Sequence, residues 1–467
     1  MKRYLVQTFG CQMNVHDSRR IEEVLGAHGY QLADEPAAAD VIVLNTCSVR
    51  EKAEQKLRSM VGTYKGLKAI RPDLVIVVAG CVAQQEGEKL LRRVPHLDVV
   101  IGPDNIAELP ALIEHVRDGA PPIARTVFDT KAPRFLVAEP RPQAREVTSY
   151  VTVMKGCDER CTYCIVPYTR GPERYRPADE IVGEIARMVD GGVREITLLG
   201  QTVNSWHSLG AGEGESEFPA LLRRIAREVP ALVRLRYTSP HPRHLTEALI
   251  EAHAELAVLP RHVHLPVQSG SDRMLKRMLR RYTAADYVRR VDRLRERVPG
   301  LTLSTDMIVG FPGETDEDFA LTLELVREVG FVSLFGFKYS PRPYTPALKL
   351  EDDVPEEKKD ERLQALFALS DQIQQAHLAA CVGTRVSVLV ETRDAAGPHR
   401  YTGRSERHEL VHLDAPEGLD PRGMLVDVEV VDAYKHSLHG LMEGGLPVMP
   451  PPPKRSPIRL PVAASGV

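Results

Sequence analysis

The sequence predicts an α/β protein in three units: an N-terminal open parallel sheet with helices, a central partial (β/α)6 barrel and a small C-terminal all-β barrel. Strands alternate with helices through residues 1–120, which favours a parallel sheet with right-handed crossovers. Six further strand–helix units lie within residues 143–375, and short alternating strands fill residues 376–446. A length of 467 residues accommodates several domains of ordinary size.

The first unit combines short buried strands with amphipathic helices. The expected strands are residues 2–10, 40–46, 73–80 and 97–102, and the expected helices are residues 17–29, 51–67 and 84–94. The stretch that follows, residues 121–146, is proline-rich and weakly periodic, so we interpret it as a linker.

The central unit repeats a strand followed by a helix. The expected strands are residues 147–155, 194–200, 232–239, 262–267, 301–310 and 331–340, and helical patterns include residues 178–192, 284–298 and 315–330. Barrels of this kind place their reactive groups at the C-terminal ends of the strands.

A long helical stretch, residues 356–382, leads to the C-terminal unit. Strand-like alternation occurs in residues 384–391, 401–406, 409–414 and 423–434. This unit has the size of a five-stranded barrel of the OB kind. The last residues, 447–467, contain PPPPKRSP and are expected to be a disordered tail.

The composition excludes several classes of protein. A net charge of -3 gives no global sign of nucleic-acid binding, and seven cysteines do not make a disulfide scaffold. The N-terminus lacks the apolar core of a secretory signal, and no apolar run reaches the roughly 18 residues of a membrane span. We therefore expect a cytoplasmic protein with reduced thiols and without a membrane partner. We also expect a monomer that does not bind DNA, although composition does not determine the oligomeric state.

The stretch GCDERCTYC, residues 156–164, carries the pattern C-x3-C-x2-C, with Cys157, Cys161 and Cys164 as its thiols. A structural zinc site usually takes four protein ligands, and a cubane iron–sulfur cluster usually takes four cysteines. Three cysteines on a cubane would leave one iron open for chemistry. The alternative, that these three cysteines share no metal site, is less favoured because the rest of the chain is poor in cysteine.

Three more cysteines, Cys11, Cys47 and Cys81, each follow a predicted strand of the first unit. The C-terminal strand ends of an open parallel sheet form one edge, and adjacent strands lie about 4.8 Å apart. Three cysteines distant in sequence can therefore form one three-thiolate site. Separate burial of each thiol is the alternative. The seventh cysteine, Cys381, stands alone and is interpreted as a packing residue.

GCDERCTYC resembles the cluster loop of radical S-adenosylmethionine enzymes, with Tyr163 at the aromatic position before the last cysteine. Over most of its length the chain also resembles the methylthiotransferases. The motifs that carry this resemblance are NTCSVREKAEQK, AGCVAQQEG, LLGQTVNSW, YTSPHP, HLPVQSGSDRMLKRM, DMIVGFPGET and KYSPRPYTPA. NTCSVREKAE together with PYTRG is most similar to the MiaB-type branch, which acts on tRNA. Related branches modify a threonylcarbamoyl-adenosine in tRNA or an aspartate of a ribosomal protein.

This resemblance implies a methylthiotransferase domain, a radical S-adenosylmethionine core and a TRAM-like barrel. It implies two [4Fe–4S] clusters, one on Cys157, Cys161 and Cys164 and an auxiliary one on Cys11, Cys47 and Cys81. One S-adenosylmethionine would methylate a cluster-bound sulfur. A second would yield a 5′-deoxyadenosyl radical that removes hydrogen from C2 of the adenine. The implied substrate is N6-isopentenyl(dimethylallyl)adenosine 37 in the tRNA anticodon loop, and an unidentified donor would supply electrons.

The predicted barrel rim carries candidate contacts to S-adenosylmethionine. For each residue, a purely structural role is the alternative to contact with the cofactor. They are Tyr163, Gln201, Asn204, Ser239, His241, Gln268, Gly310 and Glu314.

Three questions stay open. The basic residues 274–282 either contact phosphates or form a solvated helix face. The C-terminal unit is acidic from Arg385 to Leu446, so only the resemblance assigns it an RNA-binding role. A pure electron-transfer iron–sulfur protein and a structural zinc protein that binds RNA remain the competing functions.

Overall fold

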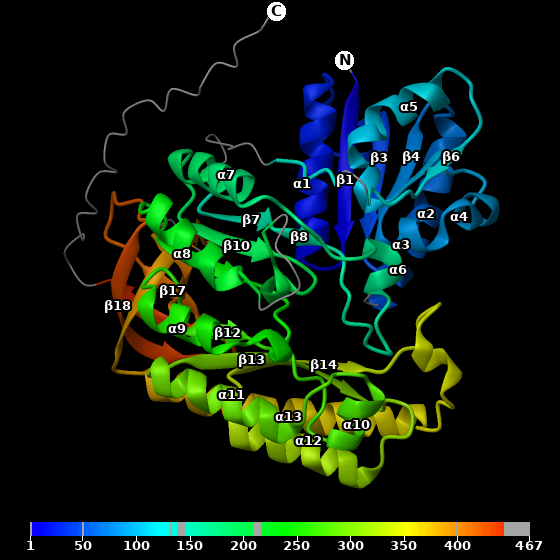
Figure 1. Ribbon diagram of the computed structural model, residues 1–467. Helices are drawn as coiled ribbons and strands as arrows, with labels where there is room; N and C mark the ends of the chain where they lie inside the picture. The colour runs from blue at the N-terminus through cyan, green and yellow to red at the C-terminus, as the bar shows by residue number, and fades with distance from the viewer. Residues whose placement is uncertain are drawn as a thin grey trace, which may run out of the picture.

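The computed structural model describes residues 2–48, 51–130, 133–137, 146–208, 216–395, 397 and 399–442. The tail expected to be disordered, residues 447–467, lies outside these ranges. The chain forms an open sheet with helices, a partial barrel and a small closed barrel, in that order (Figure 1). The predicted fold class is confirmed.

The first unit is built on a sheet of six parallel strands. They are β1 (Arg3–Phe9), β2 (Gln31–Leu32), β3 (Val41–Thr46), β4 (Val75–Gly80), β5 (Val99–Ile101) and β6 (Ile123–Arg125), in the spatial order β2-β1-β3-β4-β5-β6. The helical elements are α1 (Gln12–Ala27), η1 (Pro36–Ala38), α2 (Glu51–Ile70), α3 (Cys81–Glu86), α4 (Glu88–Arg93), η2 (Pro103–Glu108) and α5 (Leu109–Arg117).

Both faces of this sheet are covered. α1 and α5 pack on one face, and α2, α3 and α4 pack on the other. Every residue of β3 and β4 is therefore buried, which explains the apolar runs at residues 41–44 and 75–79. β6 pairs with β5 and lies in the stretch expected to be a linker, so that interpretation is wrong for residues 123–125.

The central unit contains two three-stranded parallel sheets. The first has the order β11-β10-β7, with β7 (Thr148–Thr152), β10 (Glu195–Leu199) and β11 (Arg234–Tyr237). The second has the order β12-β13-β14, with β12 (His262–His264), β13 (Thr302–Val309) and β14 (Ser333–Lys338). A short antiparallel pair, β8 (Met154–Lys155) and β9 (Arg174–Tyr175), stands beside them. The six main strands match the six predicted ones.

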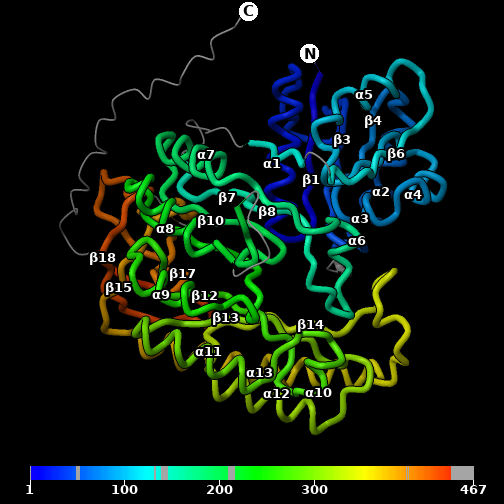
Figure 2. The backbone as a smooth tube through the Cα atoms, in the orientation of Figure 1, coloured from blue at the N-terminus to red at the C-terminus, as the bar shows by residue number. Residues whose placement is uncertain are grey.

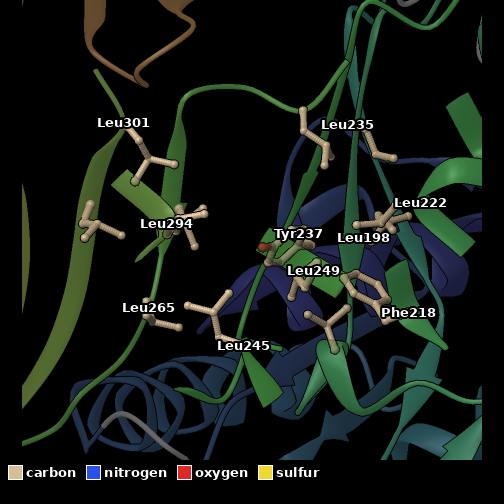
Figure 3. Packing of buried hydrophobic residues seen from close by; sticks show 14 of the residues in the cluster. Leu198, Phe218, Leu222, Leu235, Tyr237, Leu245, Leu249, Leu265, Leu294 and Leu301 are labelled. Atoms are coloured by element: carbon tan, nitrogen blue, oxygen red, sulfur yellow. The ribbon is translucent and has the colours of Figure 1, made fainter. Parts of the chain in front are cut away.

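Among the described residues, six helices pack against the outside of these strands: α7 (Ala178–Asp190), α8 (Phe218–Glu228), α9 (Glu247–Glu255), α10 (Asp272–Arg277), α11 (Ala284–Arg297) and α12 (Asp316–Val329). The other helical elements of this part of the chain are α6 (Val166–Arg170), η4 (Val203–Ser205), η5 (Pro242–His244) and η6 (Pro346–Lys349). Figure 3 shows Leu198 of β10 beside Leu222 of α8, and Tyr237 of β11 beside Leu249 of α9. This apolar layer holds the strand ends in fixed positions.

The C-terminal unit is a closed five-stranded barrel in the order β15-β16-β17-β19-β18. It follows α13 (Glu356–Cys381), which runs across the boundary expected near residue 375. The strands are β15 (Arg385–Arg393), β16 (Arg400–Ser405), β17 (Leu410–Asp414), β18 (Leu425–Ala433) and β19 (Leu438–Met442). The sequence pattern did not identify β19, a five-residue strand that contains a glycine and closes the barrel by pairing with β17 and β18.

The closed barrel contacts the N-terminal ends of the core strands (Figure 2). Arg234, the first residue of β11, donates hydrogen bonds to the backbone oxygens of Arg404 (2.6 Å) and Ser387 (3.1 Å). The ring of His262, at the start of β12, stacks on His408 with centroids 4.9 Å apart. The closed barrel therefore lies at the end of the core opposite the rim that carries the cysteine motif.

Buried ion pairs fasten the first unit to the core. The Asp104 carboxylate accepts hydrogen bonds from Lys155 (3.1 Å) and Arg174. Burial raises the pKa of Asp104, but the two cations outweigh it, and the net shift is downward. Because the folded-state pKa lies below the unfolded value, this contribution to stability is present at neutral pH and is lost as the pH falls below about 4.

We expect Asp104→Ala to lower the free energy of unfolding by about 3 kcal/mol at pH 7, because it leaves two cations without their buried carboxylate. The urea midpoint followed by circular dichroism measures this loss. The exposed Asp118→Ala is the control and should change little. Equal midpoints for the two variants would contradict the importance of this contact, and the difference should shrink below pH 4.

Candidate iron–sulfur sites

The strand register of the first sheet brings Cys11, Cys47 and Cys81 to one edge. Phe9 of β1 pairs with Thr46 of β3, and Thr46 pairs with Gly80 of β4, so the three cysteines follow adjacent strand ends. The Cys11 and Cys47 side chains are hydrogen-bonded to each other. Gly10 has a φ of 148°, and a side chain there would collide with Cys47. The close approach of these loops therefore depends on glycine.

Arg170, the last residue of α6, connects the core to this edge. Its Nε donates a hydrogen bond to Cys81 Sγ (3.2 Å), and its Nη2 donates to Asp17 (2.6 Å) in α1. A hydrogen bond with Cys47, the backbone of Asn14 and the charge of Arg170 together lower the pKa of Cys11 to about 6, against the effect of burial. Burial raises the pKa of Cys81, and Arg170 opposes this. The site thus favours one thiolate before any metal binds.

The second set lies in the loop after β8. Cys157 Sγ is hydrogen-bonded to Thr202 Oγ1 (3.0 Å), and Cys161 Sγ accepts a hydrogen bond from Arg280 Nη1 (3.3 Å). Burial raises the pKa of Cys157 to about 12, and it raises the pKa of Cys164 as well. These thiols are therefore neutral at pH 7, and a metal bound there would have to replace their protons.

Both sets suit a cluster better than a single ion. Sulfurs around a tetrahedral zinc with Zn–S bonds near 2.3 Å would lie about 3.8 Å apart. Among the residues that the structure describes, neither cysteine set has all three of its sulfurs within 4.8 Å of one another. A cubane takes one thiolate on each of several irons and suits more widely spaced sulfurs. The donors are also sulfur alone, as iron–sulfur clusters prefer.

Two of the predicted cofactor contacts, Gln201 and Asn204, form hydrogen bonds within the rim. The Gly156 N–H donates to Gln201 Oε1 (2.5 Å), which fixes the start of the cysteine loop. The Asn204 amide donates to the His241 backbone oxygen (3.0 Å) and accepts from its N–H (2.8 Å). Both polar groups of Asn204 are therefore used within the protein.

The next three candidates lie near the same rim. Ser239 is exposed and has a φ of 58°. The buried His241 ring accepts a hydrogen bond from the Arg243 N–H (3.2 Å), and burial lowers its pKa, so it is neutral at pH 7. Tyr163 is half-buried against an apolar cluster that contains Phe311 and Tyr339.

The remaining candidates lie at or beside the ends of β12 and β13. Gln268 has a φ of 79°, and its backbone bridges to β13. Gly310 has a φ of 69°, and a side chain there would meet Lys359. Glu314 accepts hydrogen bonds from the Gly310 N–H (2.7 Å) and Arg362 (2.8 Å). Burial raises the pKa of Glu314 to about 7 although both donors oppose it.

Sequence reasoning missed several residues that hold the cysteines. Thr202 directly follows the predicted Gln201, and Arg170 ends the PYTRG motif. Arg280 lies in the basic stretch 274–282, for which we considered phosphate contact and a solvated helix face. This residue is instead 5% exposed and contacts Cys161. Glu159, within the cysteine loop, binds Arg243 (2.6 Å) and His244 (2.8 Å). No spacing rule in the sequence identifies such contacts between distant segments.

Comparison with known proteins supplies independent evidence. The chain matches the models of Uncharacterized protein family UPF0004 over residues 3–102 and of the Radical SAM superfamily over residues 151–326. A solved structure of the radical S-adenosylmethionine methyltransferase TsrM from Kitasatospora setae, with cobalamin and a [4Fe-4S] cluster bound, superposes with a TM-score of 0.51 at 17% identity. That match covers 85% of this chain and 78% of TsrM, and it supports the fold. Among the described residues, no helix could span a membrane.

Curated relatives match over nearly the whole chain. The tRNA-2-methylthio-N(6)-dimethylallyladenosine synthase of Sorangium cellulosum (strain So ce56) is 62% identical over 462 residues, covering 94% of this chain and 93% of the relative. The protein of the same name from Acidithiobacillus ferrooxidans (strain ATCC 53993 / BNL-5-31) is 45% identical, covering 94% and 97%. The chain belongs to the family of tRNA-2-methylthio-N(6)-dimethylallyladenosine synthases within the radical SAM superfamily.

Proposed function

We propose that this protein adds a methylthio group at C2 of N6-isopentenyl(dimethylallyl)adenosine 37 in the anticodon loop of tRNA. The observation that carries this proposal is the pair of three-cysteine sites joined by α6, which begins two residues after Cys164 and ends at Arg170 on Cys81. The names of relatives at 45% to 62% identity support the substrate and the reaction. A structural zinc site and an electron-transfer cluster each usually take four protein ligands, whereas each site here offers three cysteines.

The residues divide between two clusters. Cys157, Cys161 and Cys164 would hold one [4Fe–4S] cluster, and Cys11, Cys47 and Cys81 would hold the auxiliary one. When bound, the clusters and S-adenosylmethionine supply radical generation at one site and a transferable sulfur at the other.

The protein's own side chains orient these groups. Hydrogen bonds of Cys157 with Thr202 and of Cys161 with Arg280 fix the sulfur positions. The Arg280 guanidinium also places a positive charge beside the Cys161 thiolate. Among the predicted contacts, we propose that Tyr163, Ser239, His241 and Gln268 face S-adenosylmethionine. Gln201, Asn204, Gly310 and Glu314 would shape its site through the contacts described above.

The decisive experiment incubates the reconstituted, reduced protein and S-adenosylmethionine with tRNA that carries N6-isopentenyladenosine. Mass spectrometry of the digested nucleosides should show the 2-methylthio derivative. The same tRNA without the isopentenyl group should give much less product. Formation of 5′-deoxyadenosine without any methylthio nucleoside would contradict the proposal.

Single cysteine variants should separate the two sites. Cys157→Ala should abolish 5′-deoxyadenosine formation, whereas Cys81→Ala should retain it and lose the methylthio product. Each variant should bind roughly half of the wild-type iron, because one three-cysteine site remains complete. Cys381→Ala, outside both sets, is the matched control and should keep the full iron content. Identical iron loss in all three variants would argue against two independent sites.

Arg170→Gln should weaken the auxiliary site. Loss of the guanidinium removes a positive charge beside the thiolates and raises the pKa of Cys11. A rise of one pKa unit would slow iodoacetamide alkylation of Cys11 about fivefold at pH 6 in cluster-free protein. Peptide mass spectrometry measures that rate, and Arg92→Gln on the exposed part of α4 is the control. An unchanged rate would remove Arg170 from the auxiliary site.

A further inference from the structure

Two tyrosines stand exposed beside the cluster loop. Tyr168 of α6 is 44% exposed and Tyr344, in the loop after β14, is 52% exposed. Their ring centroids lie 6.0 Å apart at an interplanar angle of 36°. In Figure 1, α6 lies between the first sheet and the yellow loop that follows β14. Two large rings thus form one open aromatic surface between different segments of the chain.

This aromatic surface is tied to the cysteine loop through Thr162, which lies between Cys161 and Cys164. The Thr162 backbone oxygen accepts a hydrogen bond from the N–H of Ala347, three residues after Tyr344. On its other side, the Thr162 N–H donates to Met278 O (3.1 Å) and its hydroxyl donates to Arg277 O (2.9 Å). The loop after β14 and the segment after α10 therefore converge on the cluster loop.

Tyr344 is held in a conformation that favours glycine. Its φ is 68°, in the left-handed region that bulky residues rarely adopt. The neighbouring backbone is anchored, because the Thr345 hydroxyl donates to Arg342 O (2.7 Å) and Arg342 pairs with Glu54 of α2 (3.3 Å). The ring itself remains open to solvent. Backbone strain of this kind concentrates at ligand-binding sites.

Exposed cations lie on the same segments. Arg160 is in the cysteine loop, Lys276 and Arg281 flank the contact to Thr162, and Lys349 ends η6. These side chains can neutralise phosphates, while the aromatic surface can accept the face of a base. RNA loops are recognised in this way, because their unpaired bases stack on aromatic side chains.

We propose that Tyr168 and Tyr344 form a stacking surface for an unpaired base next to the reacting adenosine in the tRNA anticodon loop. This inference rests on the proposed function and names the residues that receive the RNA. Arg160, Lys276, Arg281 and Lys349 contact the loop phosphates. The stacking holds the reacting base over the cluster loop, to which both tyrosines are tied.

The test uses the cluster-loaded protein and an anticodon stem-loop RNA that carries N6-isopentenyladenosine, with 2-aminopurine at a neighbouring loop position. Wild-type protein should quench the 2-aminopurine fluorescence as that base stacks. Tyr168→Ala and Tyr344→Gly should each weaken binding about tenfold and reduce the quenching. Tyr434→Ala, an equally exposed tyrosine on the C-terminal barrel, is the matched control and should behave as wild type.

Tyr344→Gly also separates binding from folding. Glycine adopts the observed φ without strain, so the urea midpoint should stay equal or rise while RNA affinity falls. Unchanged affinity and quenching in both tyrosine variants would overturn the stacking surface, and a methylthio product from wild-type protein would leave the proposed function standing. Lost RNA binding in these variants without any wild-type methylthio product would support the surface and refute the proposed function.

Discussion

Parallel pairing of β1, β3 and β4 is the constraint on which the site of Cys11, Cys47 and Cys81 depends. In a parallel sheet every C-terminal strand end lies at the same edge, so residues more than thirty positions apart in sequence become neighbours. The pairs Phe9–Thr46 and Thr46–Gly80 set the positions of all three auxiliary cysteines. A shift of one residue in either pairing would separate the sulfurs and turn adjoining side chains to the other face.

A second constraint is the burial of charge between the units. Arg170 reaches Cys81 and Asp17 with only 4% of its surface exposed, and Asp104 lies between two cations of the core. Such pairs cost desolvation free energy and stabilise the structure only when every partner is in place. They therefore favour one relative position of the first sheet and the core more strongly than an apolar contact would. Arg170 of the core contacts Cys81 of the first unit, so the arrangement of these cysteines and the docking of the two units depend on each other.

Sequence patterns were sufficient for the fold and for the places of the cysteines in it, but not for the contacts around them. Apolar runs ending in cysteine located β1, β3 and β4, and the C-x3-C-x2-C spacing located the second set. The short strand β6 was missed because three residues directly after Pro121 and Pro122 give no periodic signal. Asn204 was expected to touch the cofactor, yet its amide pairs with the His241 backbone. A polar residue at a strand end has the same sequence signature whether it binds a ligand or its own chain, and only the tertiary contacts distinguish the two roles.

The position of the C-terminal barrel limits what it can do for the RNA. Its contacts with Arg234, His262 and Thr302 lie at the starts of the core strands, whereas the cysteines and the exposed tyrosines lie at the other end. β13 alone spans eight residues, or roughly 26 Å at 3.3 Å per residue. A base positioned over the cluster loop therefore cannot also rest on the barrel. Any contact between barrel and tRNA must involve a part of the RNA distant from the reacting adenosine, so the residues around the cluster loop have to recognise that adenosine.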